Sequence, residues 1–110
     1  MKESTKDEML KALERKDSVV FYFYTPLCGT CQIAGKMLEI VEKMLPDLPF
    51  KKADLNYLPE MAETFSIESV PCLIHLHDGK IQNKIYAFHS VPYLYETLKE
   101  PGTARNLSKD

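Results

Sequence analysis

Two cysteines at Cys-x-x-Cys spacing, Cys28 and Cys31, are the residues of this 110-residue chain best suited to chemistry. They follow residues 19–24, an apolar and aromatic run typical of a central strand that is covered on both faces. Pro26 ends this run, and apolar residues at helical spacing begin near Gly29. The sequence therefore predicts that the two thiols lie at a strand-to-helix junction.

Disulfide exchange requires a thiolate, and a free cysteine with a pKa of about 8.5 supplies little of it at neutral pH. At the first turn of a helix, unpaired N–H groups and the helix dipole favour an anion, so the pKa of Cys28 should fall. Cys31 lies nearly one turn later and should be more buried. We therefore expect Cys28 to attack disulfides and Cys31 to resolve the mixed disulfide.

Other interpretations of these thiols remain open. The pair could be inert, or it could belong to a zinc or iron–sulfur site with Cys72 and a histidine. The candidate histidines are His75, His77 and His89. Such a site needs four ligands, and the chain has no second cysteine pair at ligand spacing, so no metal is predicted. Cys72 is expected to fill space in the core, and His75 and His77 to share a half-exposed strand face.

Composition excludes several classes of function. The chain carries 14 basic and 16 acidic residues and is 45% hydrophobic, with no basic stripe to suggest nucleic acid. No apolar run is long enough to span a bilayer, and the charged N-terminus does not resemble a signal peptide. Three cysteines do not form a disulfide framework. We therefore expect a cytoplasmic protein that binds neither membranes nor nucleic acid.

The elements expected around the thiols form an α-βαβ-α-ββ-α order, an α/β fold whose mixed sheet of about four strands has helices on both faces. The predicted strands are 19–24, 50–55, 72–77 and 81–88. Helices are predicted to begin at Ser4 or Thr5, at Gly29, at a cap on Asn56, and at Ser90. We expect one domain over residues 1–110, with an ordered core over about 5–99 and a polar C-terminal tail.

The long helix over about 29–45 is predicted to bury one apolar face. The residues expected on that face are Ile33, Met37, Ile40, Val41, Met44 and Leu45. Gly35 within this helix suggests either close packing or local softness.

Three stretches together resemble the thioredoxin superfamily. They are Thr-Pro-Leu-Cys-Gly-Thr-Cys at 25–31, Pro-Glu-Met-Ala-Glu-Thr-Phe-Ser-Ile-Glu-Ser-Val-Pro at 59–71, and Asp-Gly-Lys at 78–80. The resemblance extends over about residues 5–99 and implies a thioredoxin fold. It also implies a cis Val70–Pro71 bond beside the thiols, and a substrate surface built from Leu27, Val70, Pro71 and Ala87.

The chain departs from the family pattern at several positions that bear on function. Thioredoxins have tryptophan at the position of Leu27, proline at Thr30, and glycine at Ala87. They also have a buried aspartate at the position of Tyr22, whose lysine partner aligns with Lys52. Tyrosine is a poor base, so resolution by Cys31 should be slow unless Lys52, Asp54 or water accepts the proton.

The resemblance also implies that residues around the cysteines modulate the reactivity of the thiols. Gly29, Thr30, Tyr22 and Lys52 are expected to tune the thiols, and the first edge strand of thioredoxins is expected to be missing. The predicted function is a thiol-disulfide oxidoreductase that acts on protein disulfides. It would need no cofactor, would receive electrons from a reductase or a small thiol, and is expected to be a monomer. The alternative is a redox sensor or adaptor that binds a partner with little turnover.

Overall fold

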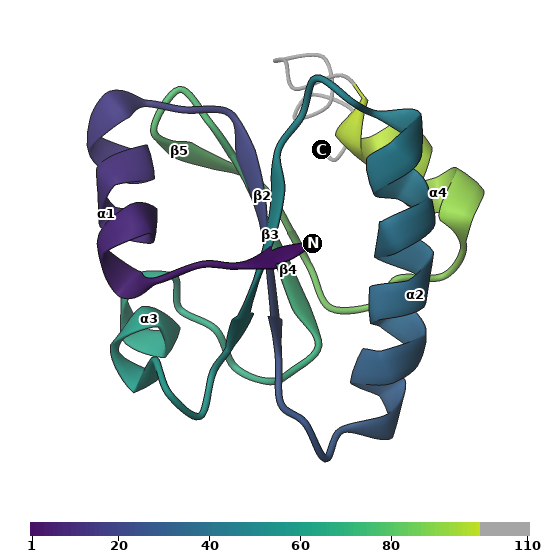
Figure 1. The fold of residues 1–110 in the computed structure, drawn as a ribbon, viewed down its shortest axis with the longest axis horizontal. Coiled ribbons are helices and arrows are strands. Elements are labelled where there is room, and N and C mark those ends of the chain that lie inside the picture. The colour runs from purple at the N-terminus through teal and green to yellow at the C-terminus, as the bar shows by residue number, and fades with distance from the viewer. Residues whose placement is uncertain (100–110) are drawn as a thin grey trace.

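The computed structural model describes residues 1–99 and contains a single mixed sheet with helices on both sides (Figure 1). The strands are β1 (Lys2–Glu3), β2 (Val19–Tyr24), β3 (Phe50–Asp54), β4 (Cys72–His77) and β5 (Lys80–Ile85). The helices are α1 (Lys6–Arg15), α2 (Gly29–Met44), α3 (Pro59–Thr64) and α4 (Val91–Leu98). From α1 onward, the order of elements predicted from the sequence is confirmed. The predicted polar tail from Pro101 onward lies outside the described residues.

The strand order is β1-β3-β2-β4-β5, with β1, β3 and β2 parallel and β4 and β5 antiparallel to their neighbours. The sheet therefore has five strands in the described part of the chain, where about four were expected. The prediction that no edge strand precedes the first helix was wrong. Two residues suffice for it, because Lys2 and Glu3 pair with Lys51 and Lys52.

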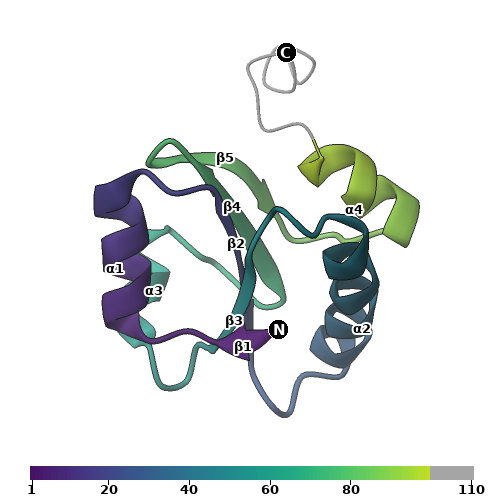
Figure 2. The same ribbon diagram turned by 45° about the horizontal axis from the view of Figure 1, so that its top comes forward.

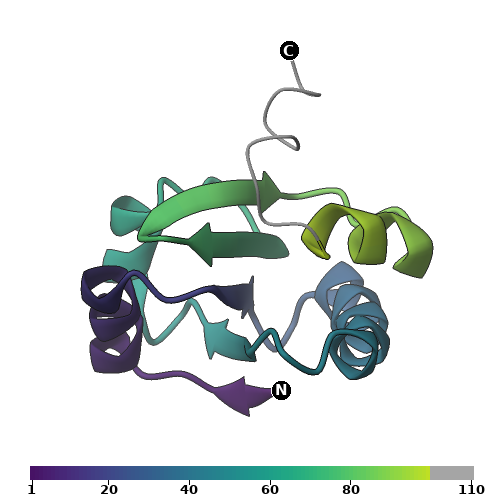
Figure 3. The same ribbon diagram turned by 90° about the horizontal axis from the view of Figure 1, so that it is seen from above.

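The sheet separates two helical layers, as Figures 2 and 3 show: α1 and α3 cover one face, and α2 and α4 cover the other. Alternate side chains of β2 enter the two resulting cores, Phe21 and Phe23 on the α1 side and Val20 and Tyr22 on the α2 side. Because β2 is buried on both faces, its continuous apolar run has the composition predicted for a central strand.

Side-chain caps mark the starts of α1 and α4. Thr5 forms a capping box with Glu8 at the start of α1, as expected, and the Ser90 hydroxyl accepts the Tyr93 N–H at the start of α4. The cap predicted on Asn56 was wrong. The N–H of Asn56 instead donates to Asp54 Oδ1 at 3.0 Å, and α3 begins two residues later than that cap would place it, after Leu58.

The inward face of α2 differs from the prediction. The buried residues are Cys31, Ala34, Leu38 and Val41. Of the predicted face only Val41 is fully buried, whereas Ile33, Ile40 and Met44 are exposed to solvent by 64%, 51% and 45%. The side of α2 that carries Ala34 and Gly35 faces the sheet: the ring of Tyr22 lies beside Gly35, where a Cβ would sit at an ordinary contact distance of 3.5 Å.

Candidate active site at the start of helix α2

Cys28 caps the N-terminus of α2 and forms a disulfide with Cys31, with 5.1 Å between the two Cα atoms. Cys28 Sγ also accepts the backbone N–H of Cys31 at 3.2 Å and lies 3.3 Å from the Thr30 hydroxyl. These are the donors that would stabilise a thiolate on Cys28 in the reduced protein. Cys28 is half-buried, whereas Cys31 is only 3% exposed, so Cys28 is the sulfur that an external disulfide can reach more easily.

Tyr22 lies directly beneath Cys31. Its hydroxyl donates to the Cys31 carbonyl, and burial raises the pKa of Tyr22 to about 12. The hydroxyl therefore stays protonated at neutral pH and holds the backbone of the first helical turn rather than accepting a proton. The rings of Tyr22 and Tyr24 stack with 5.8 Å between their centroids, and the Tyr24 hydroxyl donates to Glu3.

Lys52 of β3 forms an ion pair with the edge strand. Its Nζ lies 5.7 Å from the Tyr24 ring centroid and 3.9 Å from the Glu3 carboxylate of β1. The edge strand that sequence analysis omitted therefore supplies the counter-ion of Lys52. Asp54, at the end of β3, accepts the Asn56 N–H.

A cavity of about 370 Å³ connects Cys31 with this cluster. Tyr22, Tyr24, Gly35 and Lys52 also line it, together with Gln32, Lys36 and Glu39. Asp54 is not among the lining residues. Cys31, although buried, therefore borders a cavity.

The Val70–Pro71 bond is cis, and Pro71 precedes β4, whose first residue pairs with Phe23 of β2. This register brings Pro71 to the end of β2 from which the Cys28 segment leaves. Pro71 and Thr30 line one groove of about 300 Å³, with Ile33, Ala34, Met37, Tyr86 and Phe88 as its other walls. Leu27, predicted as a substrate contact, is fully exposed beside Cys28, and Ala87 is also exposed.

Four residues that line this groove were not predicted from the sequence to belong to the site, namely Ile33, Ala34, Met37 and Tyr86. Ile33 and Met37 were assigned to the core, and Tyr86 was not singled out. The signal for the two helical residues was available, because Ala34 and Gly35 mark the side of α2 that packs closely on the sheet. The position of Tyr86 is fixed by a hydrogen bond, in which its hydroxyl oxygen accepts the Glu68 N–H at 3.1 Å.

Cys72 lies in a different environment from the pair. It is fully buried in the core on the α1 side, whereas Cys31 belongs to the core on the α2 side. Burial raises the pKa of the Cys72 thiol to about 11. Its predicted place as a buried apolar residue is confirmed.

The histidines do not form the half-exposed face that was predicted. His75 is fully buried, with Nδ1 3.5 Å from the Asn83 amide nitrogen, and only His77 is part-exposed, 2.6 Å from the Ser18 hydroxyl. The alternation of β4 turns both toward the α2 side, but only His75 lies deep enough to be covered. Within residues 1–99, no group of three or more His, Cys, Asp or Glu residues is arranged to hold a metal ion.

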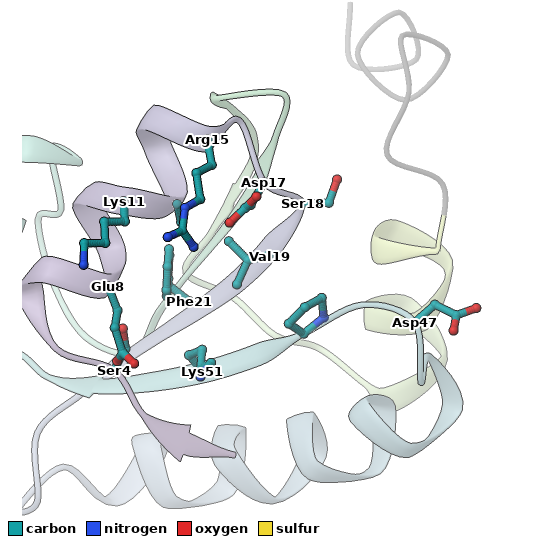
Figure 4. Close-up of a pocket in the computed structure, with 12 residues that line it drawn as sticks. Ser4, Glu8, Lys11, Arg15, Asp17, Ser18, Val19, Phe21, Asp47 and Lys51 are labelled. Carbon is teal, nitrogen blue, oxygen red and sulfur yellow. The ribbon is translucent and has the colours of Figure 1, made fainter.

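A larger cavity of about 470 Å³ lies away from the thiols, between α1 and β3 (Figure 4). Its walls carry charges of both signs, from Lys11, Arg15 and Lys51 and from Glu8 and Asp17. None of the residues predicted for the thiol site lines it.

A mixed sheet with a dithiol at the start of its long helix defines a thiol-disulfide exchange protein. The family model for thioredoxin matches residues 1–100, and the chain belongs to the thioredoxin family. It is a thiol-disulfide oxidoreductase, as predicted, and the sensor or adaptor alternative is not favoured. The family implies protein disulfides as substrates and a reductase as a partner in general.

Two curated relatives are similar in sequence. Thioredoxin-like protein YusE of Bacillus subtilis (strain 168) is 49% identical over 88 residues, covering 80% of this chain and 83% of that protein. A thioredoxin of Mycoplasmoides gallisepticum is 35% identical over 96 residues, covering 87% and 96%.

The fold matches solved thioredoxins. Oxidized mitochondrial thioredoxin 3 of Saccharomyces cerevisiae superposes with a TM-score of 0.79 at 24% identity, covering 90% of this chain and 93% of that one. This likeness confirms the predicted thioredoxin fold. In the described residues, no helix has the length and apolar character needed to cross a membrane.

Proposed function

We propose that Cys28 is the attacking nucleophile and Cys31 the resolving thiol of this oxidoreductase. The observation that carries this assignment is the position of Cys28 Sγ at the helix cap, where the Cys31 N–H donates to it at 3.2 Å. Cys31 is 3% exposed and belongs to the core on the α2 side, so Cys28 is the more accessible of the two sulfurs.

The reaction proceeds in two exchanges. The Cys28 thiolate attacks one sulfur of a protein disulfide, a mixed disulfide forms, and the other substrate sulfur leaves as a thiolate that takes up a proton. Cys31 then loses its proton and attacks Cys28 Sγ, which releases the second substrate thiolate and forms the Cys28–Cys31 disulfide. Two electrons pass from the dithiol to the substrate, and a reductase or small thiol must return them.

Water in the cavity beside Cys31 is proposed to accept the proton of the resolving thiol. Tyr22 cannot accept it at neutral pH because burial raises its pKa to about 12. Lys52 lines the same cavity but pairs with Glu3, and Asp54 is not among the lining residues. We therefore assign Tyr22 and Lys52 a modulating role, together with Gly29 and Thr30 beside the Cys28 sulfur.

The substrate surface is proposed to comprise Leu27, Val70, Pro71 and Ala87. Exposure of Leu27 and Ala87 supports this assignment, as does the groove that joins Pro71 to Thr30. An extended substrate would pair with the Val70 backbone by main-chain hydrogen bonds.

We also propose a single-domain, monomeric, cytoplasmic protein that uses no cofactor and binds neither nucleic acid nor membranes. The family match over residues 1–100 supports one domain, and a net charge of −2 without a basic stripe supports the absence of nucleic acid. Three cysteines with one redox pair fit a reducing compartment.

Paired serine variants test the roles of the two cysteines. The Cys31→Ser protein, incubated with a disulfide-bonded peptide, should accumulate a mixed disulfide that intact-mass spectrometry detects on Cys28. The Cys28→Ser protein should form no adduct. Accumulation on Cys31 in the Cys28→Ser protein, with continued reduction of the peptide, would reverse the assignment.

A further inference from the structure

Helix α2 carries a second apolar stripe that the fold leaves uncovered in the described residues. Ile33, Met37, Ile40 and Met44 are spaced alternately four and three residues apart, the a/d spacing of a coiled-coil seam. Ile33, Ile40 and Met44 are exposed by 64%, 51% and 45%, and Met37 is half-buried. The four residues, here called the α2 seam, span about 16 Å along the helix. Apolar residues in such a row typically mark an interaction surface.

The α2 seam is continuous with the candidate active site. Its first two residues, Ile33 and Met37, line the groove that also contains Thr30 and Pro71. The Thr30 hydroxyl lies 3.3 Å from Cys28 Sγ. A chain segment bound along the seam can therefore continue into the groove and present a disulfide to Cys28.

The charges beside the seam favour an acidic occupant. One flank of the seam is closed by Ala34 and Val41, which are buried against the sheet. On the open flank lie Lys36 and Lys43, seven residues apart, and neither forms an ion pair within residues 1–99. Glu39 lies one row further from the seam than these lysines. Coiled-coil partners are selected by opposite charges at such flanking positions.

The same charges disfavour the other occupants. Two copies joined through antiparallel α2 helices would place Lys36 of one copy opposite Lys43 of the other, which is repulsive. Residues 100–110 contain one large apolar side chain, Leu107, and cannot fill four seam positions.

We propose that the α2 seam binds an amphipathic helix of the protein substrate, with apolar residues at a/d spacing and acidic residues beside them, next to the disulfide to be reduced. The inference rests on the proposed function, because it names the class of protein whose disulfide Cys28 attacks. The exchange chemistry itself is unchanged.

The test uses the reduced full-length chain and synthetic peptides of about three heptads. Each peptide carries a terminal cysteine in a disulfide with the chromophore 2-nitro-5-thiobenzoate, whose release is followed by absorbance. One peptide has leucine at the a and d positions with flanking glutamates; a second replaces the glutamates by lysines, and a third replaces the leucines by serines. All rates are divided by the rate with the small disulfide 5,5′-dithiobis(2-nitrobenzoate).

The acidic leucine peptide should react about tenfold faster than either comparison peptide. The Ile40→Glu/Met44→Glu protein should lose this preference. The Leu10→Glu/Ile81→Glu protein should keep it, because these residues are comparably exposed elsewhere, by 37% and 42%. The Lys36→Glu/Lys43→Glu protein should prefer the lysine peptide instead.

Equal normalised rates for the three peptides would overturn the inference. So would a dimer, seen by sedimentation of the wild type, that the Ile40→Glu/Met44→Glu change dissociates, since a second copy would then occupy the seam. Failure of the wild type to reduce the small disulfide would instead refute the proposed function, so the two failures are distinguishable.

Discussion

The start of α2 and the strand β4 have opposite effects on the ionisable side chains that they carry. At the start of α2, the Cys31 N–H and the Thr30 hydroxyl surround a part-exposed sulfur of Cys28, which favours the charged thiolate. In β4, Cys72 and His75 are fully buried. Burial raises the pKa of Cys72 and lowers the pKa of His75, so both side chains favour their neutral forms. The comparison teaches that donors and solvent access, rather than residue type, make a thiol in this fold reactive.

The largest expected effect separates Cys28 from Cys72. Cys28→Ser should lower catalysed reduction of a disulfide-bonded peptide by on the order of a thousandfold or more, because the attacking sulfur is gone. Cys72→Ala should retain the wild-type rate within about twofold, since Cys72 lies in the opposite core. Steady-state reduction with dithiothreitol as the electron donor measures both. Comparable losses of activity in the two variants would contradict the assignment of reactivity to Cys28 alone of these two cysteines.

Alkylation sharpens the same contrast without mutation. In the reduced native protein, iodoacetamide should modify Cys28 with a half-maximal rate at a pH below the ordinary value of about 8.5. Cys72 should stay unmodified until the chain is unfolded, because its thiol is buried and its pKa is raised to about 11. Peptide mass spectrometry before and after addition of denaturant identifies the modified sites. Rapid native labelling of Cys72 would show that β4 does not protect its thiol.

The protonation of His75 should make stability depend on pH. Burial, with a smaller contribution from the charge of His77, lowers the pKa of His75 from 6.5 to about 4. The unfolded chain therefore binds the proton first as pH falls. Above pH 6.5 His75 does not lower the stability. Between pH 6.5 and 4, its protonation in the unfolded chain should lower the free energy of unfolding by about 3 kcal/mol.

Urea denaturation across this range measures the loss. Other groups also titrate there, so the informative quantity is the difference between the wild type and His75→Gln, whose amide does not titrate. The variant should show a shallower fall in unfolding free energy. Identical slopes for the two proteins would mean that His75 contributes nothing to the dependence.

The smallest effect concerns the packing of α2 on the sheet. A Cβ at Gly35 would lie 3.5 Å from the Tyr22 ring, which is an ordinary van der Waals distance. Gly35→Ala should therefore stabilise the protein by up to about 1 kcal/mol, through higher helix propensity. Thermal unfolding of the oxidised protein would reveal this gain, whereas a lower midpoint would indicate that the contact with Tyr22 has no room for a methyl group.

The expected positions of the thiols followed from local signals. Three local signals place Cys28 at the start of a helix: the apolar run of β2, Pro26, and the helical spacing after Gly29. The order of elements and the family likewise follow from motifs that lie close together in the sequence. These properties depend on short-range backbone preferences and were correct within about one or two residues for most elements.

Which side of each element faces inward was harder to predict. Helix α2 has two apolar stripes, and the sequence predicts burial of the one that contains Ile33 and Ile40. The structure buries the stripe of Ala34 and Leu38 instead, which packs with Tyr22 in the core on the α2 side. The burial of His75 likewise depends on the covering layer and not on the strand.

By itself, the sequence determined the dithiol, its place at the start of a helix, and the thioredoxin fold, because motif spacing and turn residues act locally. Only the tertiary structure decided that Lys52 pairs with Glu3 of a two-residue edge strand, that Cys72 and Cys31 occupy opposite cores, and that the α2 seam faces outward. These outcomes depend on contacts between segments far apart in the chain, where packing against a neighbour outweighs the apolar pattern of any one element.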